Sequence, residues 1–147
     1  MEQGDITLRN VTYQRLVELG RAPTIFEVAA TTNLSVEEVR AGWKRLHEAH
    51  ALVIDLETSE LLMANPFAGR PTNYEVDAGD RRWFANCAWD AFGIGAALGV
   101  DSVIQTSCPD CGDGIRLTVT DGLPSAETSI FHVLVPAARW WDDISHT

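Results

Sequence analysis

Apolar residues recur at helical spacing through the first 65 residues of the chain. The pattern predicts a helix over residues 8–19 that ends at Gly20, a residue type favoured at helix C-termini. Two further helices are expected to begin after Thr24 and Ser35, because a glutamate follows each of these residues three positions later, as in a capping box. The last of the three helices carries a single apolar stripe, formed by Val36, Val39, Trp43 and Leu46.

Two short apolar runs, residues 52–54 and 61–63, flank a polar turn and predict a hairpin. Helix, short helix, longer helix and hairpin follow one another in the order of a winged helix-turn-helix. We therefore expect residues 1–65 to form a winged-helix-like subdomain.

The charge of this subdomain argues against DNA binding. Residues 1–65 carry six basic and ten acidic side chains, and the helix after Ser35 is neutral, with three of each sign. Because phosphate contacts normally need a basic face, the subdomain is expected not to bind DNA and to pack on the rest of the chain.

From residue 66 the pattern changes to strands around one long helix. Strands are predicted at residues 74–76, 102–106, 115–119 and 130–135, and helices at residues 80–94 and 137–144. The whole chain is therefore expected to have an α+β fold. Its second part, residues 66–147, should form a small mixed β-sheet with the helix that carries Cys87 packed on it.

The composition limits the partners of the chain. It has 147 residues, 46% of them hydrophobic, and a net charge of −10, a balance that disfavours nucleic acid and anionic membranes as partners. No apolar run is long enough to cross a bilayer, and the first residues lack the basic and apolar regions of a secretory signal. We expect a cytoplasmic protein.

Two of the three cysteines form a Cys-x-x-Cys pair. Cys108 and Cys111 are spaced as in one knuckle of a zinc site, which usually needs four ligands. The alternative is a tight turn that carries two reduced thiols. Other side chains that could complete a zinc site stand elsewhere in the chain: Cys87, His47, His50 and His132.

Cys87 and Asp90 form a second pair, three residues apart on the predicted helix and on neighbouring positions of one face. A thiolate is a nucleophile and a soft-metal ligand, and a neighbouring carboxyl can donate a proton to a leaving group. The spacing alone leaves open that Cys87 is a core residue.

The stretch Arg81-Arg-Trp-Phe-Ala-Asn-Cys87-Ala-Trp-Asp90-Ala-Phe resembles the core motif of the alkylmercury (organomercurial) lyase family. The resemblance extends to residues 74–76 before it, to Ser107-Cys108 and residues 112–120 after it, and to residues 132–136 with the tryptophans beyond them. It covers most of the chain and includes the winged-helix-like subdomain, which in this family does not bind DNA.

This resemblance implies protonolysis of a carbon–mercury bond without a required cofactor. Two thiolates capture the mercury of a small organometallic substrate, and a carboxylic acid protonates the departing carbanion. Cys87 matches the first thiolate and Asp90 the proton donor. The second catalytic cysteine of the family falls near residues 128–131, which read Thr-Ser-Ile-Phe here. Either Cys108 or Cys111 supplies the second thiolate, or the reaction is weak or lost.

These observations are compatible with three function classes. The first is an alkylmercury-lyase-like protein that works through Cys87 and Asp90. The second is a non-catalytic module that binds a soft metal or a thiol through Cys108 and Cys111. Cys87 is a further candidate metal ligand, and mercury and zinc are the candidate metals. The third, which the charge disfavours, is a metal-responsive regulator that binds DNA through the helix after Ser35.

Overall fold

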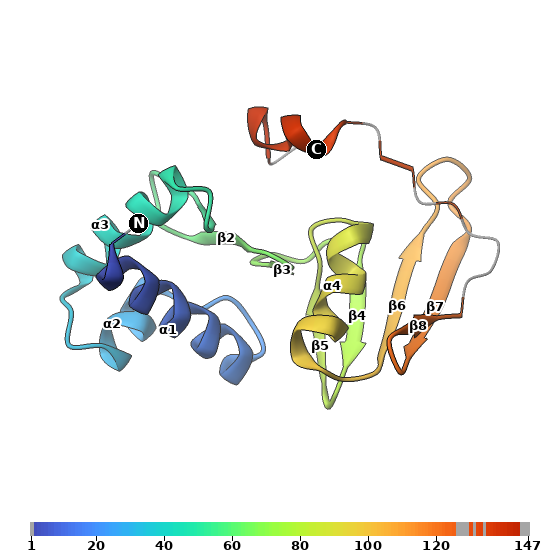
Figure 1. The fold of residues 1–147 in the computed structure, drawn as a ribbon, viewed down its shortest axis with the longest axis horizontal. Helices are drawn as coiled ribbons and strands as arrows, with labels where there is room; N and C mark the ends of the chain where they lie inside the picture. Colours follow the sequence, from blue (N-terminus) through green and yellow to red (C-terminus); the bar gives the residue numbers. More distant parts are fainter. Residues whose placement is uncertain (1, 126–129, 131, 134, 145–147) are drawn as a thin grey trace.

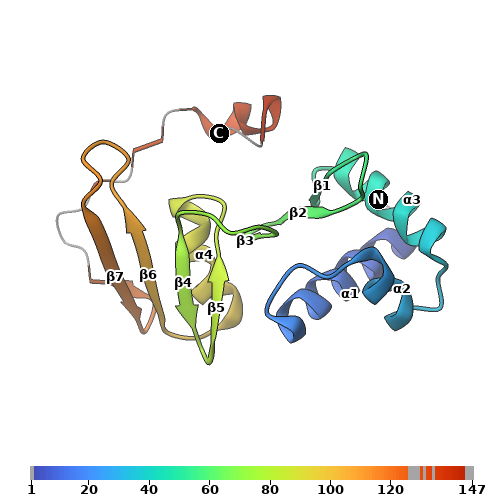
Figure 2. The same ribbon diagram turned by 180° about the vertical axis from the view of Figure 1, so that it is seen from behind.

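A computed structural model of the chain describes residues 2–125, 130, 132–133 and 135–144. Figures 1 and 2 show a helical part and a sheet part, joined by two short strands, with the C-terminal segment passing along one end of both. None of the helices formed by the described residues combines the length and the apolarity that a bilayer crossing requires. The elements are arranged in the order α1 (Gln3–Leu19), α2 (Ile25–Thr31), α3 (Val36–Glu48), β1 (Val53–Ile54), β2 (Leu61–Ala64), β3 (Phe67–Ala68), β4 (Glu75–Ala78), β5 (Arg81–Phe84), α4 (Ala88–Leu98), β6 (Ser102–Ser107), β7 (Gly114–Thr120), β8 (Leu123–Pro124) and the 3₁₀ helix η1 (Ala137–Asp142).

The three N-terminal helices begin and end largely as local chemistry predicts. Gly20 takes the left-handed conformation (φ 71°) that ends α1, and both predicted capping boxes are present, at Thr24 and at Ser35. Helix α1 begins at Gln3, earlier than predicted. Its first turn contains Asp5, a buried carboxylate that accepts a hydrogen bond from Nη2 of Arg45 in α3 at 2.8 Å, so a tertiary contact extends the helix.

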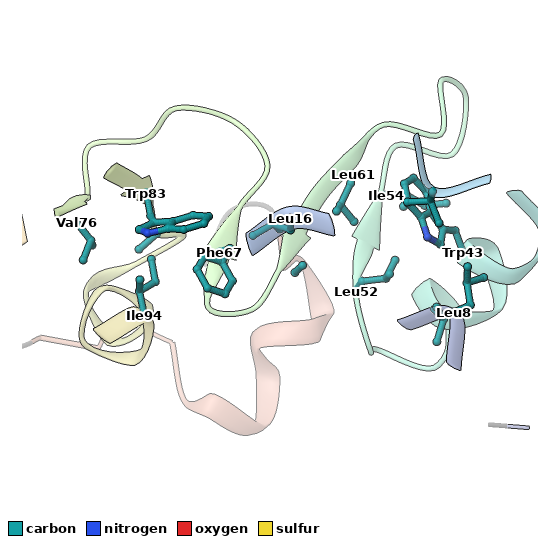
Figure 3. Packing of buried hydrophobic residues seen from close by; sticks show 14 of the residues in the cluster. Leu8, Leu16, Trp43, Leu52, Ile54, Leu61, Phe67, Val76, Trp83 and Ile94 are labelled. Atoms are coloured by element: carbon teal, nitrogen blue, oxygen red, sulfur yellow. The ribbon is translucent and has the colours of Figure 1, made fainter. Parts of the chain in front are cut away.

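One hydrophobic core runs through both parts of the molecule (Figure 3). At its N-terminal end the fully buried Trp43 donates a hydrogen bond from Nε1 to Oγ1 of Thr12 at 2.9 Å. Toward the sheet the ring of Phe67 lies 5.0 Å from that of Trp83, measured between centroids. The core includes residues on both sides of residue 65. The proposed division of the chain into two parts at that residue stays a prediction.

The strands form two antiparallel sheets, one with the order β1-β2-β3 and one with the order β5-β4-β6-β7-β8. The predicted hairpin is thus confirmed, as is the α+β class. Helix α4 packs on β4 and β6. Gly95 permits this close approach, because a Cβ atom at its position would lie 2.6 Å from Oγ of Ser102.

The predicted helix over residues 80–94 is wrong in its first half, because helix α4 begins only at Ala88. Gly79 (φ 64°) turns the chain back, and Arg81–Phe84 form strand β5 against β4. Trp83 pairs with Val76, and Nε of Arg82 donates to Oδ1 of Asp77 at 2.7 Å. Cross-strand packing and an ion pair therefore override the helical spacing, and the helix begins only after Cys87.

The C-terminal expectations are met only in part. Residues 130, 132–133 and 135 do not form the predicted strand, and Ile130 is 91% exposed; residues 131 and 134 lie outside the described part. The edge of β7 pairs with the short strand β8 instead. The predicted last helix is a 3₁₀ helix that ends at Asp142, and its Trp141 stacks on His50 at 4.1 Å between ring centroids.

Candidate active site

Cys87 stands at the junction between β5 and α4, where it is the N-cap residue of the helix with an extended backbone (φ −152°, ψ 178°). The side chain is half-buried, and this burial raises the pKa of the thiol. The N–H groups of Asp90 and Trp89 at the start of α4 act in the opposite direction, because they favour a negative charge on the sulfur. Cys87 is therefore a partly shielded thiol at a helix N-terminus. In the predicted helix over residues 80–94 it would have been a mid-helix residue that faces the core.

Asp90 lies in the first turn of α4, beside the Cys87 thiol, and the two groups shift each other's pKa. Burial raises the pKa of the Asp90 carboxyl, and hydrogen bonding by Asn86 and by Cys87 counteracts the rise. A carboxyl with a raised pKa holds a proton more readily near neutral pH than an exposed aspartate does, which suits a proton donor.

Asn86 connects this pair to the N-terminal part of the molecule. Its Nδ2 donates to Oδ2 of Asp90 at 3.0 Å and to Oδ1 of Asn65 at 3.1 Å, and the Tyr13 hydroxyl of α1 donates to the Asn65 carbonyl at 3.0 Å. Burial raises the pKa of Tyr13, and the charge of Asp90 adds to the rise. Sequence reasoning missed these three residues. The position of Asn86 next to Cys87 was the one available signal.

The other two cysteines lie in the turn between β6 and β7, as predicted. The N–H of Cys108 donates to the Asp113 carbonyl at 2.8 Å, and the N–H of Gly112 donates to the Cys108 carbonyl at 2.9 Å. The N–H groups of Cys111 and Asp110, together with the Cys111 thiol, lower the pKa of Cys108. For Cys111 the N–H of Asp113 lowers the pKa, but the side chains of Cys108 and Asp113 outweigh it and raise the pKa.

The sheet topology brings Cys87 and Cys108 to the same edge. Strands β5 and β6 both pair antiparallel with β4 (Figure 1), so they run in the same direction. Cys87 and Cys108 follow the carboxyl ends of these two strands in the sequence. Nδ2 of Asn73, just before β4, donates to Oγ of Ser107 at 2.9 Å and ties this edge together. Because β4 lies between them, the ends of β5 and β6 are about 10 Å apart, two strand spacings.

Among the described residues, no three His, Cys, Asp or Glu side chains lie close enough together to hold one metal ion. The structure brings Cys108 and Cys111 together but does not add Cys87, because β4 separates the strands that carry them. Two histidines considered as further ligands have other contacts. Nδ1 of His47 accepts from the N–H of Ile54 at 3.3 Å, and His50 stacks on Trp141. A zinc site that combines the three cysteines stays a prediction.

A cavity of about 310 Å³ is lined by Tyr13 and Asn65 together with Arg9, His50 and Trp141 of η1. It thus reaches the far end of the hydrogen-bonded chain that starts at Asp90. Neither Cys87 nor Asp90 is among the residues that line it.

Comparison with known proteins shows which family the chain resembles. Residues 67–147 match the model of the family MerB, alkylmercury lyase. Alkylmercury lyases of Bacillus cereus and Clostridium butyricum are each 30% identical to the chain over 129 residues, which is 86% of this chain and 55% of each relative. The chain thus spans about half the length of these curated relatives.

A solved structure supports the fold. The crystal structure of the mercury-bound form of MerB2 superposes with a TM-score of 0.66 at 23% identity, over 86% of this chain and 60% of that one. The family model covers more than half of the chain and includes Cys87, Asp90, Cys108 and Cys111. The chain therefore belongs to the alkylmercury lyase family.

Proposed function

We propose that the chain captures the mercury of an organomercurial on Cys87 and delivers a proton from Asp90 to the departing carbon. The observation that carries this proposal is the placement of the two groups at the N-terminus of α4, with Cys87 as its N-cap and Asp90 in its first turn. The pKa directions of both groups agree with this proximity. Family membership and the mercury-bound structural neighbour support the same chemistry.

The directions of the two pKa shifts suggest the order of the steps. Burial favours the neutral thiol of Cys87, and mercury binding displaces the thiol proton because a soft metal prefers the thiolate. The adjacent Asp90 carboxylate takes up that proton. The carbon–mercury bond then breaks with its electron pair on carbon, a C–H bond forms with the proton of Asp90, and mercury(II) stays on sulfur.

A second thiolate is needed to weaken the carbon–mercury bond, and we assign it to Cys108. Residues 128–131, where the family places its second catalytic cysteine, contain none. Cys108 lies at the same sheet edge as Cys87, and its pKa is lowered by the N–H groups of Cys111 and Asp110. Because two strand spacings separate the two positions, the β6–β7 turn has to move toward α4 when mercury is bound.

The test is the release of hydrocarbon from an alkylmercury compound in the presence of excess thiol. Cys87→Ser should abolish turnover, since a hydroxyl is a poor mercury ligand. Asp90→Asn should keep mercury binding but slow release by roughly 10²–10⁴-fold, the usual effect of losing a general acid. Asp80→Asn, at an aspartate whose side chain is 94% exposed, is the matched control and should turn over like the unaltered chain.

Two further variants identify the second thiolate. Cys108→Ser should reduce the rate sharply, and Cys111→Ser should have the smaller effect. Turnover by Cys87→Ser at the unaltered rate would show that the proposed mechanism does not operate here. Tight mercury binding without release of hydrocarbon by the unaltered chain would favour the second function class, a soft-metal-binding module.

A further inference from the structure

The turn between β6 and β7 holds two thiols in one short loop at the end of a hairpin. The hydrogen bond from the N–H of Gly112 to the Cys108 carbonyl, 2.9 Å long, closes a single helix-like turn over residues 108–112. A turn brings the Cα atoms of residues three positions apart to within about 7 Å, which overlaps the Cα separations of about 4.4–6.8 Å that a disulfide bridges. The two thiols already interact with each other, so a bond between Cys108 and Cys111 requires little backbone movement.

The backbone around the pair makes the two sulfurs chemically unequal. The N–H groups of Asp110 and Cys111 act on the sulfur of Cys108 and favour its thiolate, and the Cys111 thiol does the same. Cys111 has a raised pKa and stays protonated more readily. This division resembles that of an attacking and a resolving cysteine.

Access and surroundings fit the same chemistry. Cys111 is exposed and Cys108 half-exposed, so a small molecule can reach both. Among the described residues no third His, Cys, Asp or Glu side chain joins them to make a metal site. Cys87, in contrast, is more shielded, and its burial raises its pKa.

We propose that Cys108 and Cys111 form a redox-active dithiol that reduces small-molecule disulfides by thiol–disulfide exchange. The Cys108 thiolate attacks a disulfide RSSR, forms a mixed disulfide and releases one RS⁻. Cys111 then loses its proton and attacks the sulfur of Cys108, which forms the Cys108–Cys111 bond and releases the second RS⁻. The protein loses two electrons, and the small disulfide gains them. This activity does not depend on the proposed mercury chemistry.

The experiment is a reaction of the fully reduced chain with glutathione disulfide, with the products identified by intact mass and peptide mapping. The expected product is a chain lighter by two hydrogen atoms, with the crosslink between Cys108 and Cys111, and dithiothreitol should reverse it. Cys111→Ser should instead stop at a mixed disulfide on Cys108. Cys108→Ser, its matched partner, should likewise stop at a mixed disulfide, in this case on Cys111.

Either of two results would overturn the proposal: mixed disulfides without an internal crosslink in the unaltered chain, or oxidation of Cys87 ahead of the pair. The assay contains no mercury, and its outcome is therefore separable from that of the hydrocarbon-release assay.

Discussion

At the residue scale, Asn86 is the side chain that orients the proposed proton donor. One amide nitrogen donates to both Asp90 and Asn65, so the carboxylate has a fixed hydrogen-bonded neighbour. Asn65 is in turn held by the Tyr13 hydroxyl. The position of the carboxylate therefore depends on residues from three separate segments.

We expect Asn86→Ala to raise the pKa of Asp90 further, because the hydrogen bond from Asn86 favours the carboxylate. The pH profile of hydrocarbon release should shift toward higher pH, and the rate should fall by up to about 10²-fold as the carboxyl loses its fixed position. Asn73→Ala, which removes an amide that contacts Ser107 at the same edge, is the control. An unchanged pH profile in Asn86→Ala would show that Asn86 does not tune Asp90.

The same pKa shift affects stability. A carboxyl whose pKa is raised by folding stabilises the fold below its unfolded pKa, and this contribution is lost as the pH rises through the folded value. The charged form of Asp90 therefore stabilises the folded state less than the neutral form does. Such a cost is expected of a group whose role is in the reaction and not in stability.

At the element scale, the N-termini of α2 and α3 are fixed by reciprocal hydrogen bonds between residues three positions apart. In the first box the N–H of Glu27 donates to Oγ1 of Thr24 at 3.2 Å, and the N–H of Thr24 donates back to the Glu27 carboxylate at 2.7 Å. Arg21 adds an ion pair of 2.6 Å to the same carboxylate.

These contacts lower the pKa of Glu27 from 4.5 to about 2, and the hydrogen bond from Arg21 makes the largest contribution. The stabilisation is therefore complete above pH 4.5 and is lost as the pH falls from 4.5 to 2. We expect Glu27→Gln to unfold at lower denaturant concentration than the unaltered chain at pH 7 and at nearly the same concentration near pH 2. Glu37→Gln, at an exposed glutamate in the first turn of α3, is the control. An equal difference at both pH values would contradict the prediction.

Helix α4 holds Cys87 and Asp90 in place because Gly95 lets it lie close to β6. Gly95→Ala would put a methyl group 2.6 Å from Oγ of Ser102 and 3.1 Å from the Val100 carbonyl, so helix and strand would have to separate. We expect a loss of about 1–3 kcal/mol in the free energy of unfolding, measured in urea. Gly4→Ala, in α1 with no atom within 4 Å of the new methyl group, should not destabilise the chain.

At the scale of the whole molecule, the helices and the sheet share one core, and the C-terminal segment bridges them through the stacking of Trp141 on His50. The candidate site lies at this junction, since its hydrogen-bonded chain starts on α1 and ends on α4. We infer that the helical part helps to hold the candidate site, a role that needs no nucleic-acid partner.

The charge of the molecule leads to a prediction about DNA. The chain carries a net charge of −10, and α3 has as many acidic as basic side chains. We expect no specific duplex binding in a mobility-shift assay at low salt, where phosphate contacts are strongest. Salt-sensitive binding at sub-micromolar protein concentration would instead support the regulator class.

Features that depend on neighbours within a few residues were predictable from residue type and spacing alone. The capping boxes at Thr24 and Ser35, the glycine end of α1 and the apolar face of α3 involve contacts one helical turn apart, which local sequence specifies. The proximity of Cys87 to Asp90, three residues later, is also specified by local sequence, and so is the turn that begins at Cys108.

Features that join distant residues depend on the tertiary fold. The spacing of residues 81–84 also fits a helix, and only pairing with β4 makes them a strand, so that Cys87 becomes the N-cap of α4 and not a mid-helix side chain. The contacts of Asn86 with Asn65, and of Asn65 with Tyr13, have no local signature. The placement of Cys87 and Cys108 at one sheet edge results from strand order, and strand order is set by which apolar faces pack together in the core.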